Sequence, residues 1–181
     1  MQKALLVVDY TVDFVAEDGA LTCGLPGIQL ESYITSLTEQ FIENGEYVVF
    51  PVDVHDEADP YHPETKAFPP HNIRGTAGRD LYGTLKEVYD QHKDRVYWMD
   101  KTRFSAFAGT DLELQLRARN ISEIHIVGVC TDICVLHTAV DAYNKGFTIV
   151  IHEKGVASFN EAGHDWALGH FKNTMGATII S

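Results

Sequence analysis

The sequence predicts an α/β fold, a single-domain three-layer α/β/α sandwich with a mostly parallel central sheet. Short, wholly apolar runs recur along the chain, which is typical of strands buried on both faces of a parallel sheet. Segments with helical spacing of apolar residues alternate with these runs, as in a sheet covered by helices on both sides. The chain has 181 residues and contains no internal repeat, linker or low-complexity segment. Residues 1–181 are therefore expected to form one domain.

The first half of the chain provides two strands, a helix and a long loop. Residues 4–8 (ALLVV) are the first apolar run, and residues 47–52 are predicted as the second strand. Between them, apolar residues spaced three or four apart predict a helix over 30–43 that Asn44 and Gly45 terminate. A loop over 56–80 follows, rich in Pro, His and Gly. Loops longer than about 12–15 residues in a compact domain are usually functional.

The second half of the chain continues the alternation of strands and helices. Thr110 and Glu113 have the spacing of a capping box, which marks the start of a helix. The β-branched run from Ile124 to Val129 is typical of a buried central strand. The remaining expected elements are strands at 95–99 and 147–151, an edge strand at 177–180, and helices at 110–118, 134–144 and 160–173.

Composition limits the partners and the compartment. Asp and Glu total 26 against 14 Lys and Arg, so the formal net charge is −12. Nucleic acids and anionic membranes require a basic surface, so neither is expected as a partner. No apolar run approaches the roughly 20 residues that cross a bilayer, and no signal segment is expected at the N-terminus. The three cysteines have no disulfide-framework or zinc-ribbon spacing, which indicates a reducing, cytoplasmic location.

One stretch, residues 123–139, combines a buried strand with a reactive side chain. Thr131 and Asp132 follow the strand and are expected to cap a helix, which places Cys134 in its first turn. Unpaired amides and the helix macrodipole at that position favour a thiolate over a thiol. The same amides can receive an oxyanion when the sulfur attacks a carbonyl. The alternative is that Cys134 is a small buried hydrophobe, the commoner fate of a free cysteine.

Reactive side chains follow four of the expected strands. They are Asp9, Asp53 with His55, Lys101, and Cys134. The carboxyl ends of parallel strands meet at one edge of the sheet, where such sheets bind ligands. Side chains two residues apart in an extended segment point the same way, so Asp53 and His55 can converge on one point. Each residue alone could be structural, and their joint occurrence on one edge favours an active site.

Five stretches of the chain resemble a known enzyme family. They are LLVVDYTVDFV around Asp9, VDVH at 52–55, AFPPHNIRGTAG at 67–78, DKTRFSAFAGTDL at 100–112 and GVCTDICVLHTA at 128–139. With them the chain resembles the pyrazinamidase/nicotinamidase branch of the isochorismatase-like cysteine hydrolases, and the resemblance covers most of the chain. The D-x-H pair followed by an aromatic-Pro-Pro-His segment is the feature that points to this branch.

The resemblance implies a chemistry for the predicted edge. It implies that Cys134 attacks the amide carbon of nicotinamide and that Asp9 is the general base, with Lys101 orienting Asp9. The backbone amides of Cys130 and Cys134 are implied to bind the oxyanion, and the Val129–Cys130 peptide bond is expected to be cis. The implied reaction is hydrolysis of nicotinamide to nicotinate and ammonia through a thioester, within NAD salvage.

A metal site is the second implication of the resemblance. Asp53, His55 and His71 match the family's metal ligands, and Glu64 is a further ligand in some relatives. Oxygen and nitrogen ligands with open positions suit a divalent metal, with Zn²⁺ as the first expectation and Mn²⁺ or Fe²⁺ as acceptable alternatives. The metal is expected to take the ring nitrogen of the substrate. His62, in the same loop, is expected to be an exposed histidine.

Phe14, Phe68 and Phe107 match aromatic positions that would wall the substrate ring, although each could simply fill the core. His137, three residues after Cys134, offers an alternative Cys–His pair. Two other functions stay open: a hydrolase of the same fold acting on another amide, carbamoyl compound or ureide, and a non-catalytic protein that holds a metal. Homo-oligomers are common among the relatives, although no apolar stripe in the sequence identifies an interface.

Overall fold

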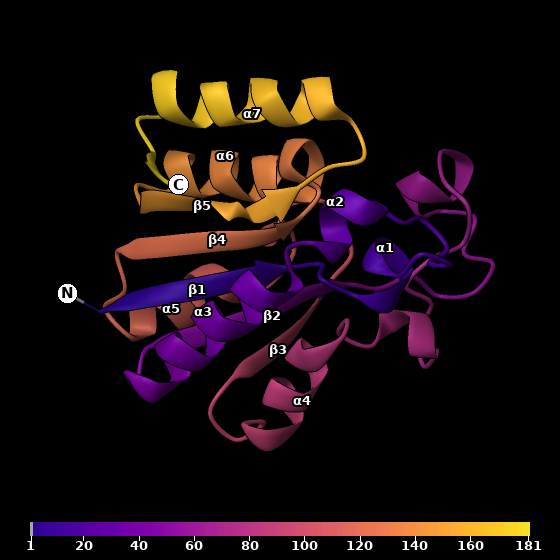
Figure 1. The fold of residues 1–181 in the computed structure, drawn as a ribbon, viewed down its shortest axis with the longest axis horizontal. Helices are drawn as coiled ribbons and strands as arrows, with labels where there is room; N and C mark the ends of the chain where they lie inside the picture. The colour runs from indigo at the N-terminus through magenta and orange to yellow at the C-terminus, as the bar shows by residue number, and fades with distance from the viewer. Residues whose placement is uncertain (1) are drawn as a thin grey trace.

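A central sheet of six strands runs through the molecule in the order β3-β2-β1-β4-β5-β6 (Figure 1). The computed structural model describes residues 2–181. The strands are β1 (Lys3–Val8), β2 (Tyr47–Asp53), β3 (Tyr97–Lys101), β4 (Glu123–Val129), β5 (Thr148–Ala157) and β6 (Thr178–Ile180). Every neighbouring pair is parallel. The α/β sandwich predicted from the sequence is therefore confirmed, and the sheet is parallel throughout.

The strand order reverses between β1 and β4. The chain adds β2 and β3 on one side of β1, then crosses back and adds β4, β5 and β6 on the other side. Parallel sheets bind ligands outside their carboxyl ends at such a reversal. In Figure 1 the arrowheads of β1 and β2 point toward the short helices α1 (Val12–Val15) and α2 (Leu25–Ile28). This edge is where the sequence places its reactive side chains.

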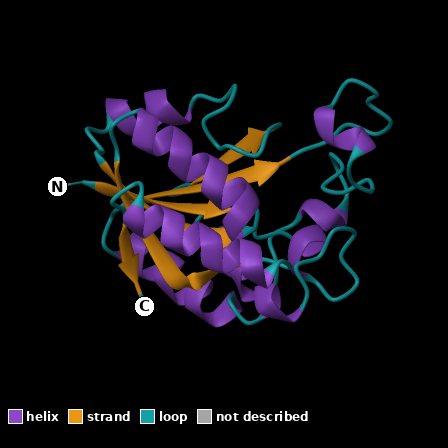
Figure 2. Ribbon diagram, turned by 90° about the horizontal axis from the view of Figure 1, so that it is seen from above, coloured by secondary structure: helices purple, strands orange, loops and turns teal. Residues whose placement is uncertain are grey.

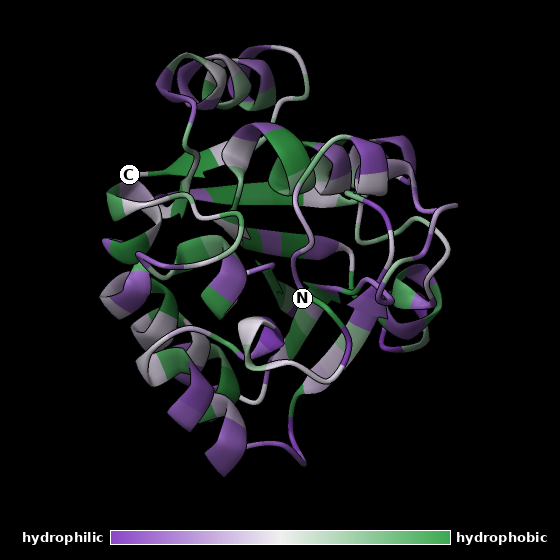
Figure 3. Cartoon of the chain, turned by 90° about the vertical axis from the view of Figure 1, so that its right-hand side faces the viewer, coloured by the Kyte–Doolittle hydropathy of each residue, from purple (hydrophilic) through white to green (hydrophobic). Residues whose placement is uncertain are grey.

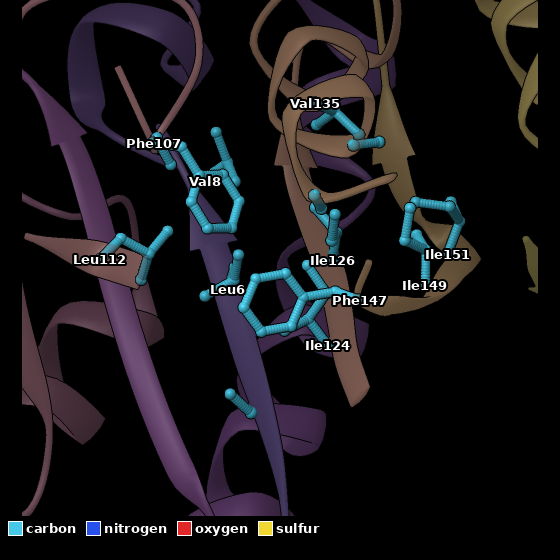
Figure 4. Packing of buried hydrophobic residues seen from close by; sticks show 14 of the residues in the cluster. Leu6, Val8, Phe107, Leu112, Ile124, Ile126, Val135, Phe147, Ile149 and Ile151 are labelled. Carbon is cyan, nitrogen blue, oxygen red and sulfur yellow. The ribbon is translucent and has the colours of Figure 1, made fainter. Parts of the chain in front are cut away.

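Helices cover both faces of the sheet (Figures 1 and 2). One face packs against α3 (Glu31–Glu43) and α4 (Thr84–Gln91), and the other against α5 (Leu112–Ala118), α6 (Leu136–Asn144) and α7 (Glu161–Asn173). Side chains of β1 alternate between the two cores: Leu6 and Val8 join one, and Leu5 and Val7 join the other. Figure 4 shows the first core, where Leu6 and Val8 face the β4 isoleucines and Phe147.

Hydropathy follows this layering. In Figure 3 the central strands are mainly green, the hydrophobic end of the scale, and much of the outer helical surface is purple. Burial of both faces of the strands is the reason that they read as continuous apolar runs. No helix within residues 2–181 is long and apolar enough to cross a membrane.

Several element boundaries differ from the sequence expectations. Helix α4 was not predicted, because its eight residues bury only Leu85 and Val88 and so carry little helical periodicity. Strand β5 runs to Ala157 instead of ending at residue 151, with a register shift against β4 between Ile126 and Gly128. The loop over 56–80 contains two short 3₁₀ turns, at Pro63–Lys66 and Ala77–Arg79.

Candidate active site

The predicted reactive side chains meet at the carboxyl edge of the sheet. Asp9 directly follows β1, Lys101 is the last residue of β3, and its register partner is Asp53 at the end of β2. Cys134 lies in a π-helical turn, Thr131–Val135, that follows β4. The structure thus brings together Asp9, Lys101 and Cys134 from three separate strand ends, as the sequence analysis expected.

Lys101 connects the other groups of the site. Its Nζ lies 2.7 Å from Asp9 Oδ2, 3.7 Å from Cys134 Sγ and 3.7 Å from Asp53 Oδ1. The side chain is only 1% exposed, and Asp9 is 0% exposed. Asp9 Oδ1 accepts a hydrogen bond from the Asp53 amide at 2.8 Å. Both oxygens of Asp9 are therefore held by fixed groups, without solvent.

Burial and the neighbouring charges together shift the pKa values of Asp9, Cys134 and Lys101. Burial raises the pKa of Asp9 to about 6, although the Lys101 ammonium opposes the rise. Burial also raises the pKa of the Cys134 thiol; the Lys101 ammonium opposes this rise, and the carboxylates of Asp9 and Asp53 add to it. Burial would lower the pKa of Lys101, but the anionic groups around it raise it instead, so the ammonium stays charged. Helix amides were expected to favour the thiolate, whereas the buried surroundings favour the thiol and place it near a carboxylate that can accept its proton.

The turn that carries Cys134 is shaped by the end of β4. The Val129–Cys130 peptide bond is cis. The Cys130 carbonyl accepts hydrogen bonds from the amides of Ile133 and Val135, at 3.1 and 3.2 Å. No side chain caps this turn. The Thr131 hydroxyl instead bonds His164 Nδ1 of α7 at 2.8 Å, which ties the turn to the outer helix.

A second cluster, Asp53, His55, Glu64 and His71, lies beside these residues. All four are buried, and their ligand atoms lie within 4.8 Å of one another. The Nδ1 of His71 donates to the Pro69 carbonyl at 2.7 Å, which directs its Nε2 toward the two carboxylates. Asp53 Oδ1 and His71 Nε2 are buried without a hydrogen-bond partner.

This donor set fits a divalent cation. Two imidazoles and two carboxylates are ligands of divalent transition metals, and a second-shell carbonyl on a ligating imidazole is usual. Against the effect of burial, Asp53 and Glu64 raise the pKa of His71 to about 10. The cluster therefore attracts positive charge. Asp53 belongs to this cluster and also faces Lys101, so it connects the two parts of the site.

His62 is not an exposed loop histidine, as the sequence analysis expected. It is 8% exposed, and its ring centroid lies 4.1 Å from that of His55. Its Nε2 bonds the Thr102 carbonyl at 2.9 Å. The ring therefore packs against a member of the cation cluster, a contact that no local sequence pattern marks.

An apolar cavity opens onto both clusters, because Cys134 and Glu64 are in its wall. Its large apolar side chains are Phe14, Leu21, Phe68, Phe104, Ile133 and Phe159. Phe107 does not line this cavity. It packs in the core against Phe147, with ring centroids 5.7 Å apart. Phe104, Leu21, Ile133 and Phe159 were not predicted as lining residues, because in the sequence they look like ordinary core positions.

His137 does not pair with Cys134. Its Nδ1 donates to the Ile133 carbonyl one turn earlier, at 2.7 Å. Its ring packs against Phe104, with centroids 5.3 Å apart. The Cys–His alternative therefore has no geometric support.

Comparison with known proteins agrees with this geometry. The model of the isochorismatase domain family matches residues 3–181. The uncharacterized isochorismatase family protein PncA of Bacillus subtilis is 65% identical over 181 residues, 99% of each chain. The crystal structure of nicotinamidase/pyrazinamidase PncA from B. subtilis has a TM-score of 0.99 at 64% identity over 100% of both chains. The pyrazinamidase of Pyrococcus horikoshii in complex with zinc has a TM-score of 0.87 at 28% identity, over 100% of this chain and 99% of that one. The chain belongs to the isochorismatase family.

Proposed function

We propose that this protein is a nicotinamidase that hydrolyses nicotinamide to nicotinate and ammonia through a thioester on Cys134. The observation that carries the proposal is the position of Lys101, whose ammonium reaches Asp9, Cys134 and Asp53 within 3.7 Å. One buried cation thus joins a thiol and its base to a cluster that suits a metal. The similarity to proteins named nicotinamidase/pyrazinamidase and pyrazinamidase supports the choice of a pyridine or pyrazine carboxamide.

The first half of the reaction transfers the acyl group to the enzyme. Asp9 takes the proton of the Cys134 thiol, and the sulfur attacks the amide carbon. The backbone amides of Cys130 and Cys134 then bind the oxyanion. When the tetrahedral intermediate collapses, the C–N bond breaks and Asp9 returns its proton to the leaving ammonia.

The second half releases the acid. Asp9, again a carboxylate, takes a proton from water, and the resulting hydroxide attacks the thioester carbon. The C–S bond breaks, the proton returns from Asp9 to the sulfur, and the product acid loses its own proton to solvent and leaves as nicotinate. Lys101 keeps its charge throughout, and its ammonium offsets the negative charge that moves between Asp9 and Cys134.

A divalent metal completes the proposal. Asp53, His55, His71 and Glu64 would hold it, and zinc is the first choice because the similar P. horikoshii pyrazinamidase is complexed with zinc. When bound, the metal supplies a Lewis acid for a ring nitrogen of the substrate. The rings of Phe14 and Phe68, whose centroids lie 5.2 and 6.2 Å from that of His71, would hold the substrate ring beside the cluster.

An ammonia-release assay tests the function. The protein should release ammonia from nicotinamide, lose this activity after treatment with a chelator, and regain it with added zinc. The Cys134→Ala variant should release none while still binding nicotinamide in a calorimeter. Full ammonia release by that variant would overturn the mechanism, and activity on carbamoyl compounds alone would overturn the substrate assignment.

A further inference from the structure

Two thiols outside the proposed reaction lie against each other beside the cavity. The Sγ atoms of Cys23 and Cys130 are 3.0 Å apart, although the residues are 107 positions apart in the sequence. Both are free cysteines, 4% and 8% exposed. An approach of about 1 Å would bring the sulfur atoms to the roughly 2.05 Å length of a disulfide bond. The fold has therefore already brought two distant parts of the chain together for this bond.

We propose that Cys23 and Cys130 are a modification site that forms a reversible disulfide with peroxide, and that this disulfide lowers turnover at Cys134. The first part depends only on the thiol pair. The second part rests on the proposed function.

The substrate cavity provides access for the oxidant. Cys130 is in the wall of the cavity, so hydrogen peroxide can reach its sulfur by the route of the substrate. The hydrogen bond with Cys23, together with burial, raises the pKa of the Cys130 thiol. Oxidation should thus be slow compared with that of an exposed thiolate, and proximity rather than acidity should decide which sulfurs join.

The chemistry is complete with peroxide as the oxidant. One sulfur attacks a peroxide oxygen, so that an S–O bond forms, the O–O bond breaks and one water leaves after proton transfer. The second sulfur then attacks the resulting sulfenic acid, the S–S bond forms, and the S–O bond breaks to release a second water. Two thiols are oxidised and one peroxide is reduced. A dithiol reverses the bond by exchange.

The segment around Cys23 is held in place. The Cys23 amide donates to the Phe14 carbonyl at 2.8 Å. A Cβ placed on Gly27 would lie 2.9 Å from the Cys23 Cβ, so the backbone of α2 packs directly against this side chain. The Tyr10 hydroxyl in turn bonds the Gly27 carbonyl at 2.8 Å. Closing the disulfide should therefore draw Cys130 toward Cys23 and not displace Cys23 alone.

Movement of Cys130 reaches the nucleophile. Its carbonyl is the acceptor for the Ile133 and Val135 amides on either side of Cys134. Its own amide is one of the two proposed oxyanion donors. A displaced donor weakens transition-state binding, and loss of one such donor costs about 10²–10³ in kcat in other enzymes. A shift that keeps the bond but lengthens it should have a smaller effect, on the order of tenfold.

The thiol pair is tested without the nucleophile. The Cys134→Ala protein retains two of the three cysteines, Cys23 and Cys130. It is exposed to hydrogen peroxide and then to an alkylating reagent, and its intact mass is measured by mass spectrometry. We expect the mass to fall by that of two hydrogen atoms and neither thiol to be alkylated. Digestion should give a peptide pair linked through Cys23 and Cys130, and dithiothreitol should break this link. The Cys134→Ala/Cys23→Ala control should show no such loss and no link. Two alkylatable thiols after exposure, or a link that forms no faster in the folded protein than in urea, would overturn the proposal.

The effect on turnover is tested with the nucleophile present. Peroxide also oxidises Cys134, so wild type is compared with Cys23→Ala, which cannot form the link. Wild type should lose activity in step with the linked peptide, more than Cys23→Ala, and regain the difference with dithiothreitol. Equal losses in both proteins would overturn the regulatory part. If untreated wild type hydrolyses no nicotinamide, the proposed function fails. The mass measurements on the Cys134→Ala protein still decide whether the disulfide forms.

Discussion

Replacing Lys101 by Met should both destabilise the fold and strongly reduce turnover. The ammonium lies 2.7 Å from Asp9 Oδ2 and 3.1 Å from the Arg103 carbonyl, and it is 1% exposed, so water cannot take its place. Removing one partner of a buried ion pair costs about 3–5 kcal/mol, because the remaining group must either keep an unpaired charge or take up a proton to lose it. For a protein of this size that corresponds to a fall in Tm of roughly 6–20 °C. Turnover should fall by about 10²–10⁴, because Asp9 then stays protonated and cannot act as the base.

The double variant Asp9→Asn/Lys101→Met separates stability from catalysis. It removes both charges of the pair, so its free energy of unfolding should be higher than that of Lys101→Met, although both variants should be inactive. Urea denaturation followed by circular dichroism measures the first quantity, and ammonia release measures the second. The reasoning is refuted if Lys101→Met unfolds within about 0.5 kcal/mol of wild type, or if the double variant is the less stable of the two.

Three other outcomes follow from the same structure. Burial lowers the pKa of His152 to about 4, so between about pH 4 and 6.5 the unfolded chain binds more protons than the folded protein. The free energy of unfolding should therefore fall as the pH drops through this window. The His152→Gln variant should show a flatter dependence of this free energy on pH in urea titrations. A Cβ at Gly128 would overlap the Val8 carbonyl, so Gly128→Ala should lower the free energy of unfolding by more than about 4 kcal/mol or prevent folding. The Gly146→Ala control, with open space around the new Cβ, should lower it by about 1 kcal/mol. Glu64→Gln should weaken zinc retention by at least about tenfold against a chromogenic chelator, and the exposed Glu57→Gln control should leave it unchanged.

The strands and the reactive strand ends could be predicted because they follow local rules. A strand buried on both faces must be apolar throughout, and the residue after it must lie at the sheet edge, as Asp9 does. The wall of the cavity could not be predicted in the same way. Phe104 and Phe107 are three residues apart in one loop, yet Phe104 lines the cavity and Phe107 is buried in the core against Phe147, a difference that no local pattern marks. The burial of His62 likewise depends on a carbonyl 40 residues away.

Asp53 explains why the thiol and the cation cluster lie in one site. Its amide holds Asp9, its Oδ1 faces Lys101 at 3.7 Å, and its Oδ2 contacts His55 at 2.7 Å. Against the effect of burial, the Lys101 ammonium lowers the pKa of this carboxyl, with help from the two imidazoles, so it stays ionised. A carboxylate placed there on a rigid strand end keeps the cation cluster and the nucleophile at a constant separation. Under the proposed function, a flat aromatic amide would be held at two places, at the thiol and at a metal in the cation cluster, whereas an amide without a ring donor would gain only the contacts at the thiol.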